Sequence, residues 1–175
     1  MTTKDDPKKL AEEGKRAFEA RQYEAAAQAF RQAAEGYASQ KDALNAAEMH
    51  NNLSVALLKA GKAQAALEAA AGTEQVFASS GDVKRQAMSL GNQAAALEAL
   101  KRVDEAIAAY ERSAELFGQA GERDLRSMVL KSAAALKLKR GKVSESAMEM
   151  LDSLGSVKKP TLLQRLLKLV LRLKP

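Results

Sequence analysis

The stretch VDEAIAAYERSAELF (residues 103–117) decides the fold, because its pattern recurs along the chain at an interval of 40 residues. Its apolar residues are spaced three and four apart, which places them on one face of a helix. The aromatic residue that ends the stretch has counterparts one and two intervals earlier, at Phe77 and Tyr37. Self-similarity at a fixed period of this size predicts a stacked array of helical units, each of which buries its apolar face against its neighbours.

Such arrays present surfaces to partners, so the repeat favours a binding function over a catalytic one. Small residues at Ala26, Ala66 and Ala106 predict close packing of the second helix of each unit on the first. The aromatic side chains at the ends of these second helices are expected to fill the core between units.

The charge of the chain is concentrated at its C-terminal end. The 175 residues include 28 Lys and Arg against 22 Asp and Glu, for a net charge of +6. Residues 158–175 contain six of the basic residues and no acidic one, so the rest of the chain is neutral. A neutral body argues against nucleic acid as a partner, since that requires basic residues spread over one face.

Residue types that are rare or missing exclude further classes of function. The chain has no Cys and one His, which together cannot form a typical zinc site, and no cofactor motif is present. His50 aligns with two leucines of later units and is expected to fill a packing position. With a polar N-terminus and no apolar run long enough to span a membrane, we expect a non-enzymatic, cytoplasmic protein.

The sequence predicts an all-α fold without strands. Eight helices in four antiparallel pairs are expected at residues 7–20, 23–39, 42–60, 63–79, 82–101, 104–119, 122–139 and 143–154. Asp42, Asp82 and Glu122 each follow a helix-breaking residue and are expected to cap the next helix. The predicted organisation is a disordered segment at 1–6, a superhelical domain at 7–154, a linker at 155–160 and a basic amphipathic helix at 161–175.

The repeat resembles the tetratricopeptide repeat over residues 7–154. The motif positions of that family are matched by Gly14, Tyr23, Ala26, Phe30 and Ala33 in the first unit, by Asn52, Gly61 and Ala66 in the second, and by Leu90, Ala94, Val103, Ala106 and Tyr110 in the third. The family period is about 34 residues, so this chain resembles the long-helix variant, with units of about 40. The resemblance implies a right-handed α-solenoid that acts as a scaffold or adaptor.

The resemblance also implies a concave groove lined by the first helix of each unit. The groove positions carried over to this chain are Lys8, Ala11, Lys15, Phe18, Glu19, Glu48, Asn51, Val55, Leu58, Lys59, Met88, Gly91, Ala95, Glu98, Ala99, Met128, Lys131, Ala135, Leu138 and Lys139, with Asn52 and Asn92 beside them. This mixed lining suits a protein or peptide partner of amphipathic or acidic character, although a solvated face without a partner remains the alternative. The family's clamp for a C-terminal carboxylate is not expected, because only Asn52 matches it.

The C-terminal segment is amphipathic if helical, and about 21 Å long, too short to span a bilayer. Its apolar and basic faces are formed by Leu162, Leu163, Leu166, Leu167, Leu169, Val170 and Leu173, and by Arg165, Lys168 and Arg172. Three interpretations remain open: a helix that caps the last unit, an interfacial helix on an anionic membrane, and a docking element for another protein or a second copy of the chain.

Overall fold

The computed structural model describes residues 6–155, with side chains for residues 6–142. This part of the chain is entirely helical: α1 (Pro7–Glu19), α2 (Tyr23–Ser39), α3 (Ala43–Lys59), α4 (Ala63–Ala70), α5 (Thr73–Ser79), α6 (Val83–Ala99), α7 (Val103–Gln119) and α8 (Arg123–Gly155). The all-α solenoid class predicted from the repeat is therefore confirmed. The chain divides into two compact units, Met1–Ala133 and Ala134–Pro175.

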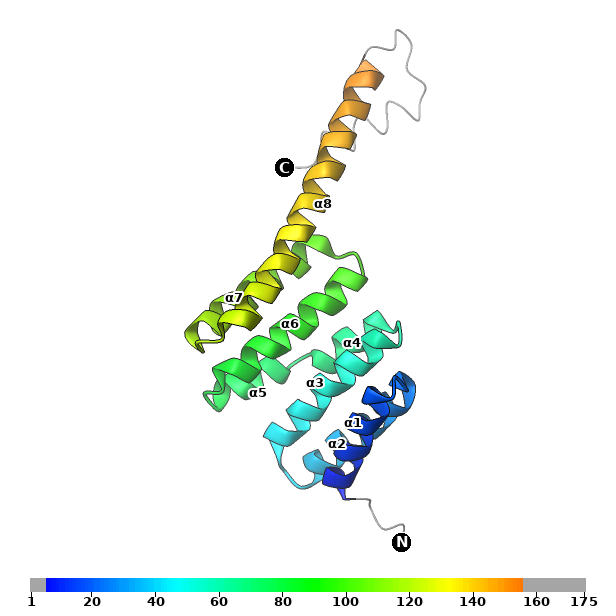
Figure 1. Cartoon of the computed structure of the whole chain (residues 1–175), viewed down its shortest axis with the longest axis vertical. Coiled ribbons are helices and arrows are strands. Elements are labelled where there is room, and N and C mark those ends of the chain that lie inside the picture. The colour runs from blue at the N-terminus through cyan, green and yellow to red at the C-terminus, as the bar shows by residue number, and fades with distance from the viewer. Residues whose placement is uncertain (1–5, 156–175) are drawn as a thin grey trace. The chain divides into compact units, whose positions relative to one another are not determined.

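In the first unit the helices stack in two layers. Helices α1, α3 and α6 lie side by side in one layer (Figure 1). Helix α2 packs on both α1 and α3, while α6 packs on α3, on α4 and α5, and on α7. Helix α2 thus bridges α1 and α3, and the α4–α5 segment bridges α3 and α6, which is the packing of a helical-repeat array.

Alanines at repeated positions allow this close stacking. Ala26, Ala66 and Ala106 are fully buried, as the repeat predicted. The aromatic side chains of Phe77 and Phe117 are also buried, and Tyr37 packs partly buried against the core. Small side chains bring helix backbones together, and the larger rings then fill the spaces between successive pairs.

The helix caps expected at Asp42 and Asp82 are present. The Asp42 carboxylate accepts a hydrogen bond from the backbone N–H of Asn45 (3.1 Å), and Asp82 accepts one from that of Arg85 (2.9 Å). Glu122 precedes α8, but its carboxylate lies 2.7 Å from Lys84 Nζ, in an ion pair between elements. Helices α3 and α6 therefore begin where the sequence predicted, for the predicted reason.

The helix expected at 63–79 is broken, which corrects one prediction. Gly72 adopts a left-handed conformation (φ 78°) that ends α4 and precedes α5. The carbonyl of Ala70, which lacks a continuing helix, lies 2.8 Å from Thr73 Oγ1 and accepts a hydrogen bond from Gln93 Nε2 (3.1 Å). Side chains therefore satisfy the backbone group that the break would otherwise leave unpaired.

The expected fourth helix pair is also corrected. Helix α8 runs without interruption through the turn predicted at Arg140 and Gly141, so 122–139 and 143–154 belong to one helix. Gly141 has no left-handed backbone, unlike Gly61 at the equivalent position (φ 77°). Glycine permits a turn but does not impose one. Gly155, expected in the linker, is the last residue of α8; the helix expected at 161–175 lies outside the described residues.

Candidate functional site

A hollow of about 290 Å³ lies between α1 and α3, at the surface predicted to bind partners. It is lined by Lys15, Phe18, Glu19, Phe30, Glu48, Asn52 and Val55. Five of the predicted groove positions, Lys15, Phe18, Glu19, Glu48 and Val55, therefore meet in one place, together with Asn52, which was expected beside them. Only Phe30, which comes from α2 beneath the two first helices, was not expected in the lining.

The floor of this hollow depends on a glycine. A Cβ atom at Gly14 would lie 2.6 Å from Cε1 of Phe30, so the missing side chain lets the ring pass directly under α1. Phe30 is buried, whereas Phe18 is partly exposed and meets Tyr23 edge-on, with ring centroids 5.4 Å apart. The hollow therefore has an aromatic floor and an aromatic wall.

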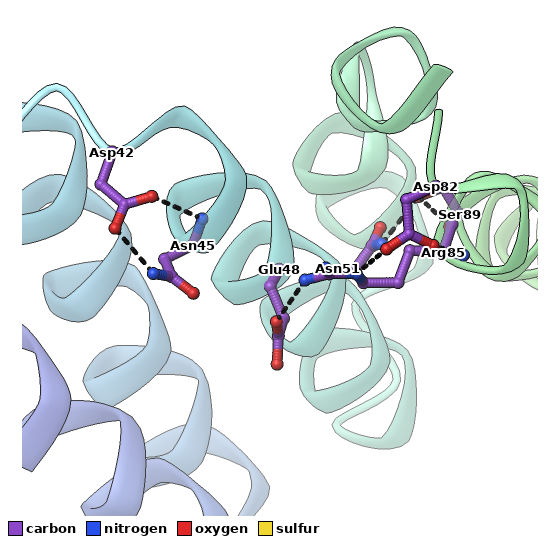
Figure 2. Close-up of polar contacts among 7 residues, drawn as sticks. All are labelled: Asp42, Asn45, Glu48, Asn51, Asp82, Arg85 and Ser89. Atoms are coloured by element: carbon purple, nitrogen blue, oxygen red, sulfur yellow. Dashed lines mark hydrogen bonds and ion pairs between the residues drawn. The ribbon is translucent and has the colours of Figure 1, made fainter. Parts of the chain in front are cut away.

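The rim of the hollow is charged. Lys15 Nζ lies 2.9 Å from Glu12 Oε1, a hydrogen-bonded pair that raises the pKa of Lys15 and lowers that of Glu12. Glu48 accepts a hydrogen bond from Arg85 Nη1 of α6 at 3.0 Å, and Asp82 accepts one from Arg85 Nε at 2.6 Å (Figure 2). The bond to Asp82 is the main cause that raises the pKa of Arg85.

Asn51 does not line the groove, which corrects its predicted role. Its side chain is buried, and its amide nitrogen donates a hydrogen bond to Ser89 Oγ at 2.7 Å (Figure 2). Its amide oxygen lies 3.0 Å from Thr73 Oγ1, so the hydroxyl of Thr73 can donate to it. Asn51 therefore joins α3 to α5 and α6 inside the stack and is not available to a partner.

Gly91 occupies the equivalent position one unit later and is likewise directed into the stack. A Cβ there would lie 3.4 Å from Ser113 Oγ and 3.8 Å from Val129 Cγ1. None of the other predicted groove positions lines the hollow between α1 and α3. Ala11 is buried in the core, which corrects its predicted role. The others retain some solvent exposure: partly exposed Leu58, Asn92, Ala95 and Glu98, and exposed Lys8, Lys59, Met88, Ala99, Met128, Lys131, Ala135, Leu138 and Lys139. Leu138 belongs to the second unit.

A larger hollow of about 400 Å³, which the sequence did not predict, adjoins the break between α4 and α5. Half of its lining residues are alanines, and the others include Gly72, Thr73 and His50. His50 is exposed, so its predicted packing role is wrong. The protein around its ring still removes part of the hydration, which lowers the pKa of His50, and the charge of Glu35 opposes that shift. The glycine followed by a β-branched residue at 72–73, inside an otherwise helical run, was the signal for this break.

The predicted tail residues, Leu162, Leu163, Leu166, Leu167, Leu169, Val170, Leu173, Arg165, Lys168 and Arg172, lie outside the described residues. Within residues 6–155, no helix combines the length and the apolar character that crossing a bilayer requires.

Stacked helix pairs with an open hollow between successive first helices define a helical-repeat protein of the tetratricopeptide-like class. The chain matches the family model of the soluble NSF attachment proteins (SNAP) over residues 10–171, and it belongs to that family. No curated protein matches the chain significantly. The family consists of non-catalytic adaptors that bind other proteins.

Proposed function

We propose that this protein is a non-enzymatic adaptor that binds an amphipathic segment of a partner protein along the face formed by α1, α3 and α6. In this proposal its repeat is the long-helix variant of the tetratricopeptide unit, with about 40 residues per unit. The hollow between α1 and α3 is the observation that supports the proposal best, because predicted groove residues from two helices meet in it. Its apolar floor and polar rim suit a helix or an extended peptide.

The family supplies the first candidate partner. The name of the family states that its members attach NSF, and we carry this over to the present chain as a proposal. Asn52 and Asn92 occupy equivalent positions on α3 and α6, and both are partly exposed. Their side-chain amides can donate to and accept from the backbone of a bound segment. Lys59, exposed at the end of α3, adds a cation on the same helix as Asn52.

A triple variant tests this face. Asn52→Ala, Asn92→Ala and Lys59→Ala together are expected to reduce capture of purified NSF by at least tenfold while leaving helicity and the melting temperature unchanged. A matched control removes two exposed amides and one exposed cation from second helices, as Gln28→Ala, Gln64→Ala and Arg31→Ala. If NSF does not bind the wild-type chain, partners cross-linked in cells replace it as the probe. Full binding by the first triple variant would exclude this face.

A second candidate function is attachment to an anionic membrane surface through residues 161–175. The observation in its favour is that residues 158–175 contain all of the net positive charge and no acidic side chain. Cationic segments are attracted to anionic lipid and are released by salt. Flotation of the full chain with vesicles that contain phosphatidylserine, at low and high salt, tests this. Absence of flotation at low salt leaves the tail as a cap or a docking element for protein.

A further inference from the structure

The hollow between α1 and α3 joins aromatic rings and carboxylates, a combination that selects for a particular type of side chain. Phe18, Phe30 and Val55 provide its apolar surface, and Glu19 and Glu48 stand at its rim. A long aliphatic stem can lie on the rings while a terminal cation reaches the carboxylates. The face of an aromatic ring also attracts a cation within about 6 Å of its centroid.

The charges at the rim favour a cation over an anion. Among the described residues, Lys15 is the one cation in the lining, and it is already paired with Glu12. Glu48 accepts a hydrogen bond from Arg85 through Oε2, and its charge also attracts Lys15. The lining therefore contributes two carboxylates against one lysine, and that lysine has a carboxylate partner of its own.

An arginine of the chain itself already makes this combination of contacts, with an aromatic ring and carboxylates. The Arg85 guanidinium lies 5.2 Å from the centroid of the Phe77 ring. It also forms ion pairs with Asp82 (2.6 Å) and with Glu48 (3.0 Å). One arginine thus takes up an aromatic face and two carboxylates, one of which also lines the hollow. The hollow offers a second arginine the same two kinds of contact, aromatic rings and carboxylates.

We propose that the hollow between α1 and α3 binds an arginine side chain of the partner segment, with the stem on Phe18 and Val55 and the guanidinium at Glu19 and Glu48. This inference rests on the proposed function, because it names the residue by which the partner is anchored. It replaces the acidic character expected of the partner with a cationic anchor at this position. Arginine is preferred over lysine because its planar guanidinium stacks on rings and pairs with carboxylates in a fixed geometry.

Small molecules test this without the partner. N-butylguanidinium chloride, titrated into the ¹⁵N-labelled full chain, is expected to shift the backbone amide signals of α1 and α3 around Phe18 and Val55. Saturation is expected with a dissociation constant on the order of 10 mM, the range for so few atoms. Pentanoate, which has a similar chain and the opposite charge, is expected to produce no saturable shift. Equal binding of pentanoate, or no saturation by butylguanidinium, would overturn the inference.

Variants that remove one charge from the rim test whether the hollow prefers a cation. Glu19→Gln is expected to weaken butylguanidinium binding about threefold to tenfold, and Lys15→Gln to strengthen it about twofold, because each changes one charge at the rim. Glu13→Gln, an exposed change on the same helix outside the lining, is the matched control and is expected to have no effect. An equal effect of Glu13→Gln and Glu19→Gln would show nonspecific attraction and reject the pocket.

Different results would contradict the adaptor function and the arginine anchor. If the groove variants retain every partner while butylguanidinium still binds and discriminates as expected, the proposed function is wrong and the cation pocket stands. If the groove variants lose the partner but butylguanidinium and pentanoate are not distinguished, the adaptor function stands and the arginine anchor is wrong.

Discussion

The side-chain amide of Asn51 donates a hydrogen bond to Ser89 Oγ across 2.7 Å, and this buried bond links α3 to α6. The pair has a counterpart one repeat later, where Gly91 approaches Val129. Thr73, which can donate to Asn51, corresponds in the same way to Ser113 beside Gly91. Two successive interfaces of the array are therefore built on one geometry, the first with a polar network and the second with small and apolar side chains.

Replacing Asn51 with Ala is expected to lower the free energy of unfolding by about 1–3 kcal/mol. The substitution leaves the hydroxyl groups of Thr73 and Ser89 with fewer partners inside the stack, and buried polar groups without partners are costly. Urea denaturation followed by circular dichroism measures the change. Gln28→Ala, on the exposed side of α2, is the control and should change stability by less than about 0.5 kcal/mol. A similar small change for Asn51→Ala would mean that the network contributes little.

Two glycine substitutions are expected to have opposite signs. Gly14→Ala forces a Cβ to within 2.6 Å of the Phe30 ring and should destabilise the fold by about 1–3 kcal/mol, as overpacking does. Gly141→Ala lies inside α8, where no described atom other than the helix's own backbone lies within 4 Å of the new Cβ, and it should stabilise that helix by about 0.5–1 kcal/mol. Thermal unfolding of both variants checks the pair. Stabilisation by Gly14→Ala would contradict the close approach of Phe30.

The break between α4 and α5 should depend on Gly72. Gly72→Ala places a Cβ in the left-handed conformation at φ 78°, at a cost of about 1–2 kcal/mol. No neighbouring atom lies within 4 Å of that Cβ, so the cost is conformational and not steric. Gly72→Asn, which tolerates this conformation better, should recover part of the loss. Denaturation of both variants distinguishes these outcomes: equal losses would show that the left-handed backbone is not the cause.

Acid should weaken the start of α6 through Asp82. The hydrogen bonds from the backbone and side chain of Arg85 hold the pKa of Asp82 below its ordinary value. Because the pKa is lower in the folded chain, this stabilisation is complete above the ordinary value of about 3.9 and is lost as the pH falls through the folded value. Asp82→Asn keeps a capping side chain but cannot titrate. The free energy of unfolding of this variant should fall less than that of the wild type between about pH 4 and pH 2. Urea denaturation at each pH measures both.

Removing residues 156–175 should turn a basic chain into a nearly neutral one. The sequence pI is about 9.5, and the segment holds six basic residues and no acidic one. Isoelectric focusing checks the charge, and the melting temperature of the 1–155 fragment checks the role of the tail. An unchanged melting temperature favours a membrane or protein anchor, whereas a lower one favours a cap on the helical repeats.

The sequence by itself determined the repeat, the helical class and most helix boundaries. These depend on local properties: the apolar spacing within each helix, the capping carboxylates of Asp42 and Asp82, and the small buried residues exemplified by Ala66. Each is encoded within a few residues and recurs every 40, so the pattern identifies it without knowledge of distant contacts. Lys15 and Val55, which the family resemblance placed in the groove, and Asn52, expected beside them, line one hollow.

Only the tertiary structure decided which repeated positions face the groove and which face the next unit. Asn51 and Asn52 are adjacent in sequence and polar alike, yet one is buried against Ser89 and the other lines the hollow. Gly72 breaks a helix, whereas Gly141 continues one. Glycine allows either backbone, and the outcome at Gly72 depends on Thr73 and the distant Gln93, which satisfy the freed carbonyl of Ala70. Such long-range partners are set by the stacking of whole helices and not by local spacing.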